Sequence, residues 1–128
     1  MWYSLTLSNP PKPGEIAARV RVPETSPWFS GHFPDFPVLP GIAQLAMVRD
    51  AVSRVSGGDV KVSGLRRVRF KQMIRPGQEL DVAIARQGRA GEFTFRITVG
   101  PDLVCSGIME TVLETEGPEM VIKGERQT

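Results

Sequence analysis

The spacing of the hydrophobic residues predicts one helix. Between residues 41 and 56 the chain has no proline, and its apolar residues recur at helical spacing. These residues are Ile42, Leu45, Val48, Val52 and Val55. Pro40 presets the entry, and Gly57–Gly58 provides a stop. We therefore expect a helix over Gly41–Ser56, about four turns long, with one strongly apolar stripe.

Most of the remaining chain alternates apolar and polar residues, which is typical of strands with one buried face. The expected strands cover residues 15–22, 60–74, 80–85, 92–99 and 103–113. Turns at 75–78, 87–91 and 100–102 join the later strands into hairpins. Hairpins predict an antiparallel sheet, and the helix stripe must be buried against its apolar face, so the fold class is α+β.

Three segments do not fit either pattern. Residues 25–40 contain four prolines, which predict a stiff, ordered loop in place of a helix or strand. The stretch 1–13 begins with a short alternating segment and ends in three prolines that a central strand would not accept. The tail from Glu114 is acidic, contains glycine and proline, and is expected to be loose. We expect a single domain over residues 1–128.

Composition excludes several classes of protein. Of the 128 residues, 41% are hydrophobic and 23% charged, as in an ordinary globular domain. One cysteine and one histidine are too few for a disulfide framework or most zinc sites, and no metal is expected. The net charge of +2 gives no argument for nucleic acid. No apolar run approaches the roughly 20 residues of a membrane helix, and no signal peptide is evident, so we expect a cytoplasmic protein.

The one histidine, His32, lies in the proline-rich loop that leads into the helix. It could simply be packed and hydrogen-bonded to backbone. Alternatively, the free amides near Gly41 and Ile42 could bind a partial negative charge, aided by the helix dipole. A neutral imidazole facing a carbonyl held on such an amide could remove the proton next to that carbonyl.

The segment Gly31–Gly41, followed by Gln44 and Leu45, resembles the signature of the hot-dog 3-hydroxyacyl-acyl-carrier-protein dehydratases of the FabA/FabZ type. The form of residues 36–41 looks most like the branch associated with aryl-polyene pathways. A second stretch, residues 68–80, resembles the family's phenylalanine-lysine strand and Pro-Gly turn. The resemblance covers roughly residues 14–113.

This resemblance implies a long central helix wrapped by a curved antiparallel sheet, in a homodimer or higher even oligomer. It implies a hydro-lyase without a cofactor, which converts a 3-hydroxyacyl thioester into a trans-2-enoyl thioester in fatty acid or polyene/polyketide-type synthesis. The partner would be an acyl carrier protein with its phosphopantetheine-linked acyl chain. In this scheme His32 takes the proton from C2 and the Gly41 amide holds the thioester carbonyl. Further substrate contacts would come from Phe33, Pro40, Gln44 and Ala46.

The chain departs from the family at the acidic helix residue, whose position is taken by Ala46. Asp50 follows one turn later and could replace the missing acid, or it could be a surface carboxylate paired with Arg49 or Arg54. Gln44 could orient substrate or water, or be structural. The alternative functions are therefore a catalytically impaired thioester-binding subunit or an acyl thioesterase.

Arg67, Arg69 and Lys71 also have two interpretations. Alternating charges can mark a solvated sheet face, but a basic patch near the site could also guide an acidic carrier protein. Cys105 lies within an expected strand, where we expect it to be a packed small residue.

Overall fold

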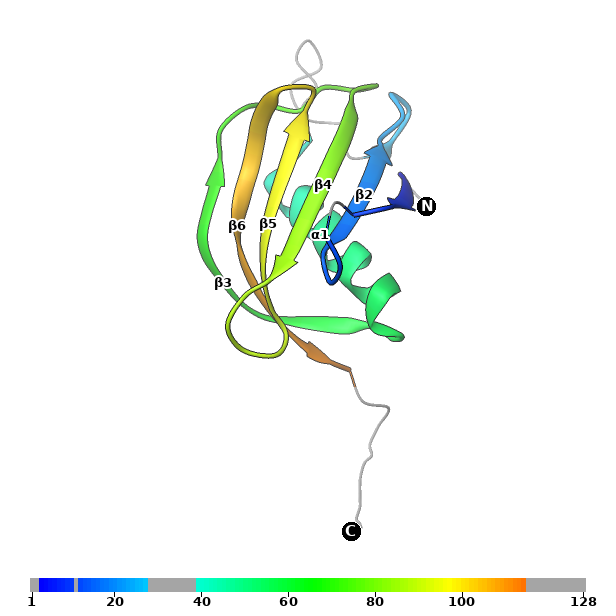
Figure 1. Cartoon of the computed structure of the whole chain (residues 1–128). Helices are drawn as coiled ribbons and strands as arrows, with labels where there is room; N and C mark the ends of the chain where they lie inside the picture. The colour runs from blue at the N-terminus through cyan, green and yellow to red at the C-terminus, as the bar shows by residue number, and fades with distance from the viewer. Residues whose placement is uncertain (1–2, 11, 28–38, 115–128) are drawn as a thin grey trace.

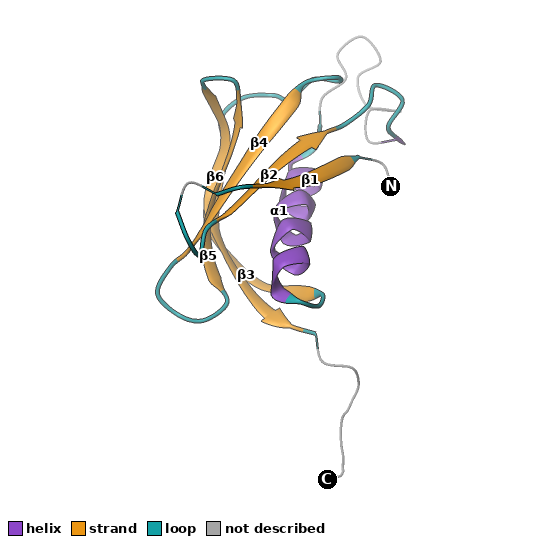
Figure 2. Cartoon of the chain, turned by 45° about the vertical axis from the view of Figure 1, so that its right-hand side comes forward, coloured by secondary structure: helices purple, strands orange, loops and turns teal. Residues whose placement is uncertain are grey.

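The computed structural model describes residues 3–10, 12–27 and 39–114. Its elements follow the order β1 (Ser4–Ser8), β2 (Ile16–Arg21), α1 (Gly41–Ser56), β3 (Val60–Phe70), β4 (Glu79–Arg86), β5 (Glu92–Val99) and β6 (Asp102–Leu113). The strands pair antiparallel in one sheet, in the order β1-β2-β4-β5-β6-β3. The sheet curves around α1, which lies against its inner face (Figures 1 and 2). This is the architecture that the hot-dog resemblance predicts.

The bounds of α1 agree with the prediction from the proline-free segment. Pro40 precedes the helix in an extended conformation, with φ −62° and ψ 152°. Gly57 follows it in the left-handed region, at φ 78°. A residue with a Cβ is disfavoured there, so this glycine ends the helix at the predicted place.

The predicted apolar stripe of α1 was wrong for two of its members. Ile42 is 70% exposed and Val55 48% exposed. The helix residues that are buried are Ala43, Gln44, Met47, Val48, Ala51 and Val52. The small alanine side chains let the helix approach the sheet closely, so the side of the helix that carries them faces the sheet. Ile42 lies about 120° around the helix axis from the buried Val48 and therefore faces solvent. Val55 lies in the last turn and is only half covered.

The two central strands confirm the alternation in the sequence. Leu80, Val82 and Ile84 of β4 are buried, and so are Phe93, Phe95 and Ile97 of β5. Cys105 of β6 is fully buried, and this burial raises the pKa of its thiol to about 11. The expectation of a packed small residue is confirmed, and the raised pKa keeps the thiol protonated at neutral pH.

Strand β3 ends at Phe70, four residues before the predicted end. The pairing with β6 shifts between Arg66 and Arg69, and Arg67 has φ 55°, so the strand is bulged there. Ile74 then leaves the sheet and is 1% exposed, and its carbonyl accepts a hydrogen bond from the Leu39 amide at 2.8 Å. This bond links the turn after β3 to the chain that enters α1.

The last described residue, Glu114, donates its amide to the carbonyl of Asp59 at 3.0 Å. The remainder of the predicted tail, and most of the proline-rich loop, lie outside the described residues. In the part of the chain that is described, no helix has the length and hydrophobicity needed to span a membrane.

Candidate active site

The first turn of α1 presents two backbone amides that no described residue engages. The carbonyl of Pro40 accepts hydrogen bonds from the amides of Ala43 and Gln44, at 3.1 and 3.3 Å. The amides of Gly41 and Ile42 have no partner among the described residues. Because a trans peptide directs its N–H away from its C=O, the bonds to Pro40 point the Gly41 amide out of the helix. These amides coincide with the positive end of the helix dipole, where a polarised carbonyl oxygen would be stabilised.

The ring of Phe70 lies against Gly41. A Cβ placed on Gly41 would be 2.7 Å from Cζ of Phe70, closer than real side chains approach one another. Phe70 itself is 50% exposed, so its ring forms a half-open wall beside the free amides. Gly41 and Phe70 belong to two separate motifs of the sequence. Their contact was not predicted, because no local pattern links residues so far apart in the chain.

Gln44 is held in the core beneath the helix entry. Its side chain is 3% exposed, and its Nε2 donates to the carbonyl of Leu39 at 3.3 Å. Its Oε1 is buried without a hydrogen-bond partner in the described part of the chain. The bond to Leu39 gives Gln44 a structural contact at the chain segment that leads to Gly41.

Ala46 is half-buried, and Asp50 lies one turn further along α1. The Tyr3 hydroxyl donates to Oδ2 of Asp50 at 2.6 Å. Arg54 approaches the same oxygen at 3.5 Å, which is the pairing that the surface-carboxylate interpretation predicts. The Asp50 side chain is 19% exposed, so this ion pair does not separate it fully from solvent.

Tyr3 was not among the predicted site residues. Its pKa is raised well above the usual range, first by burial and then by its hydrogen bond to Asp50 and the charge of that carboxylate. Tyr3 precedes a short edge strand and meets α1 only in the folded chain. The alternation in the sequence placed it in a strand-like segment but carried no signal for its partner.

The predicted catalytic histidine, His32, and the predicted substrate contact Phe33 lie outside the described residues. Of the predicted site, the structure describes the residues at the start of α1 and along it: Pro40, Gly41, Gln44, Ala46 and Asp50. Gln44 is on the buried side of the helix, and a shared role of these residues in one site stays a prediction. The approach of His32 to these residues stays a prediction.

The three cations predicted for docking lie around one hollow on the outer face of the sheet. This hollow, of about 460 Å³, is lined by Arg67, Arg69 and Lys71 and also by Arg96 of β5. None of the four forms an ion pair within the described residues. Arg96 was not among the predicted docking residues. It pairs with Ser106 of β6, and it comes near the cations of β3 because β6 lies between β5 and β3 in the sheet.

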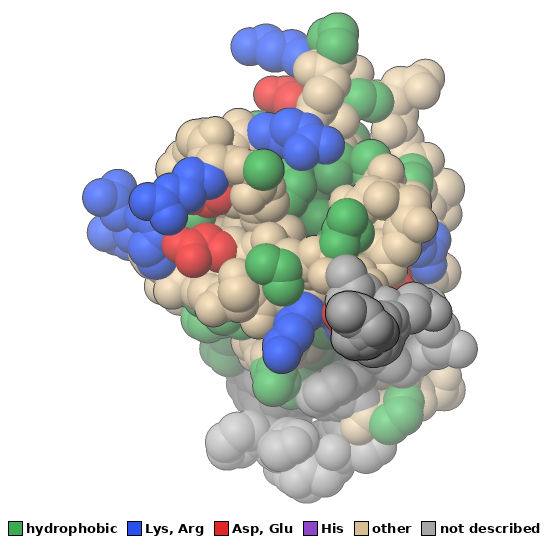
Figure 3. Space-filling view, turned by 90° about the horizontal axis from the view of Figure 1, so that it is seen from below, with side chains coloured by type: hydrophobic (Ala, Val, Ile, Leu, Met, Phe, Trp, Pro, Cys, Tyr) green, Lys and Arg blue, Asp and Glu red, His purple; other side chains and the backbone are tan. Residues whose placement is uncertain are grey.

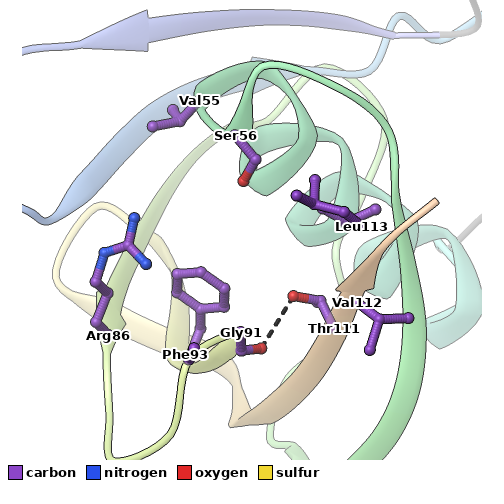
Figure 4. A pocket seen from close by; sticks show the side chains of 10 residues that line it. Val55, Ser56, Arg86, Gly91, Phe93, Thr111, Val112 and Leu113 are labelled. Carbon is purple, nitrogen blue, oxygen red and sulfur yellow. Dashed lines mark hydrogen bonds between the residues drawn. The ribbon is translucent and has the colours of Figure 1, made fainter. Parts of the chain in front are cut away.

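A second hollow, of about 510 Å³, lies at the opposite end of α1 (Figure 3). In Figure 4 the side chains of Val55, Leu113 and Phe93 surround it, with Arg86 at one side. The Arg86 guanidinium is 5.5 Å from the ring centroid of Phe93. This hollow is separated from Gly41 by the length of the helix, about 22 Å, and no predicted site residue lines it.

Comparison with known proteins first defines the class. A solved structure of the dehydratase heterocomplex ApeI:P from Xenorhabdus doucetiae superposes with a TM-score of 0.71 at 26% identity, covering 80% of this chain and 91% of that chain. Thioesterase superfamily member 2 from Mus musculus shares the fold, with a TM-score of 0.64 at 12% identity, over 85% of this chain and 80% of that chain. The protein is therefore of the hot-dog class, which contains both dehydratases and thioesterases.

The sequence comparisons then select one family within that class. The profile of the ApeI-like dehydratases matches residues 8–108. The 3-hydroxyacyl-[acyl-carrier-protein] dehydratase FabZ of Shewanella woodyi is 32% identical over 107 residues, which cover 73% of this chain and 70% of the relative. The chain belongs to the ApeI-like dehydratase family.

Proposed function

We propose that the protein removes water from a 3-hydroxyacyl thioester to give a trans-2-enoyl thioester. Membership of a dehydratase family supports this reaction class. The structural observation that supports it best is the Gly41 amide at the start of α1, which no described residue engages and which lies in the residue packed against Phe70. An amide in this position can hold the thioester carbonyl and stabilise the negative charge that develops when C2 loses its proton.

In the proposed reaction His32 is the base that removes the C2 proton. The C2–H bond breaks, the C2–C3 double bond forms, and the C3–O bond breaks as protonated His32 gives the proton taken from C2 to the hydroxyl, which leaves as water. The proton lost from C2 balances the proton carried by the water, so no co-reactant is required. Phe33, Pro40, Gln44 and Ala46 are proposed to contact the substrate, and Asp50 to act on its hydroxyl.

We propose an acyl carrier protein as the partner that presents the substrate. The relative from Shewanella woodyi is named for activity on such carriers. The hollow lined by Arg67, Arg69 and Lys71 offers cations that no described carboxylate neutralises, and Arg96 adds a fourth. An acidic carrier would be attracted to this face by charge. The cytoplasmic location expected from the sequence stays a prediction.

A second candidate follows from Ala46, which cannot donate a proton. The chain could bind thioesters without reacting, or pair with a homologue that supplies an acid. The solved ApeI:P relative is itself a heterocomplex, which favours keeping this alternative beside the proposed homodimer.

Incubation of the purified protein with 3-hydroxyacyl carrier proteins of several chain lengths tests the proposal. We expect the enoyl product to form, followed by its absorbance and by mass spectrometry, in a preparation containing only this chain. A FabZ enzyme provides the working control. Lack of turnover by this chain alone, together with turnover after a sister chain is added, would favour the second candidate.

A further inference from the structure

Asp50 has one oxygen engaged and one available. Oδ2 accepts a hydrogen bond from the Tyr3 hydroxyl at 2.6 Å and lies 3.5 Å from the Arg54 guanidinium. Oδ1 has no hydrogen-bond partner among the described residues, and the side chain retains 19% exposure. The two contacts therefore restrain the carboxylate through Oδ2 and leave Oδ1 as an acceptor that no described residue engages.

The groups that restrain Asp50 are themselves fixed. Tyr3 is only 7% exposed, so its ring has little freedom to move. Arg54 also donates to the carbonyl of Leu5 at 2.6 Å, and Leu5 pairs with Val20 in the neighbouring strand. The start of β1 and the side of α1 are thus joined through a small network, defined here as the Tyr3 network: Tyr3, Asp50 and Arg54.

This inference rests on the proposed function. We propose that Tyr3 is a positioning residue, which holds Asp50 so that Oδ1 accepts a hydrogen bond from the substrate hydroxyl or from water. The Tyr3 hydroxyl and the Arg54 guanidinium both donate hydrogen bonds to Oδ2. The Tyr3 network therefore holds this carboxylate as a hydrogen-bond acceptor. Asp50 then orients the leaving hydroxyl, a role different from the proton donor that the missing family acid would have been. Ala46 leaves space on the same side of α1, one turn closer to Gly41.

A purely structural role is the competing explanation, because the same bonds attach β1 to α1. The two explanations differ in what removal of the Tyr3 hydroxyl does to turnover. If Tyr3 acts through Asp50, its hydroxyl matters only while the carboxylate is present. If it only attaches the strand, its loss lowers stability and leaves kcat unchanged.

The experiment compares kcat, KM and the unfolding midpoint of the wild type, Tyr3→Phe, Asp50→Asn and the double variant. We expect Asp50→Asn to lower kcat by roughly a hundredfold. Tyr3→Phe should lower kcat by about tenfold, the usual order for one hydrogen bond to a charged group, with KM little changed. In the Asp50→Asn background, the same Tyr3 substitution should change kcat by less than about twofold, because coupled residues are not additive.

Thr111→Val is the matched control. It removes one part-buried hydrogen bond, from Thr111 to the Gly91 carbonyl at 2.9 Å. Thr111 belongs to β6, which three strands separate from β1 and its Tyr3 network in the order of the sheet. It should lower the unfolding midpoint without lowering kcat. The inference is overturned if Tyr3→Phe leaves kcat unchanged, or lowers it equally with and without Asp50. Absence of turnover in the wild type would instead overturn the proposed function itself.

Discussion

Gly41 is a residue whose size the site restricts sterically. Its amide has no partner in the described part of the chain, and the Phe70 ring occupies the space that any side chain would need. Ala46 has the opposite character, because its side chain is small at the position where the sequence resemblance places an acidic residue of the family. Substitutions at Gly41 and Ala46 therefore test how these side chains affect turnover.

Gly41→Ala should lower turnover by about tenfold, because the new Cβ must displace the ring that lies 2.7 Å away and the neighbouring amide shifts with it. The ring is half exposed and can move, so the loss of stability should be small. Steady-state kinetics and thermal unfolding measure both effects. Adding Phe70→Leu should restore part of the lost turnover, and failure of that rescue would remove the ring from the explanation.

Ala46→Glu should raise turnover, most clearly below neutral pH. A glutamate there would lie one turn from Asp50, and repulsion between the two carboxylates would raise the pKa of one of them. A raised pKa lets a carboxyl group keep its proton and act as an acid closer to neutrality. Rates measured from acidic to neutral pH test this, with Ala46→Gln as the uncharged control. Equal rates for the two variants at every pH would contradict it.

At the scale of elements, the bounds of α1 and the positions of β4 and β5 could be predicted, because proline, glycine and strict alternation act locally. The buried side of α1 could not, since small alanines turned a different face inward from the one marked by Ile42. The helix residues of the proposed site come from the sequence motif, and their joint role stays a prediction. The contacts of Phe70 and Tyr3 with α1 depend on chain folding, and no local pattern contains them.

The attachment of β1 to α1 should weaken at alkaline pH. The pKa of Tyr3 is raised in the folded protein by burial and by Asp50, above its ordinary value of 10.0. Its contribution to stability is therefore fully present below about pH 10 and is lost as the pH rises toward the raised folded-state pKa.

The measurement for this prediction is urea unfolding of the wild type and Tyr3→Phe at pH 8 and at higher pH. We expect the difference in unfolding free energy between the two proteins to shrink as the pH rises above about 10. Cys105 also has a raised pKa, but it is present in both proteins and cancels in the comparison. A difference that is constant with pH would contradict the account.

For the whole molecule, the sheet places its charges and its free amides in different regions. The four cations of the outer hollow belong to β3, the residue after it, and β5, whereas Gly41 begins the helix on the inner face. A partner could therefore be recognised by charge at one surface while its acyl group reacts at another.

Arg69→Glu should raise KM for a carrier-linked substrate by about tenfold and leave KM for a short pantetheine-linked substrate unchanged. The reason is that only the carrier has the acidic surface that Arg69 would attract. Arg21→Glu makes the same charge change at an exposed position on β2 and provides the control. An equal effect of both substitutions would indicate a response to net charge alone.

We propose above that this chain dehydrates a 3-hydroxyacyl thioester with His32 as the base. The most direct measurement is enoyl formation by the wild type and His32→Ala on the same 3-hydroxyacyl carrier protein, after both are shown to be folded and equally assembled. We expect turnover in the wild type and none in the variant. We also expect similar unfolding midpoints, because the sequence predicts that the prolines, and not His32, determine the shape of the loop. Undiminished turnover in His32→Ala would contradict the proposal.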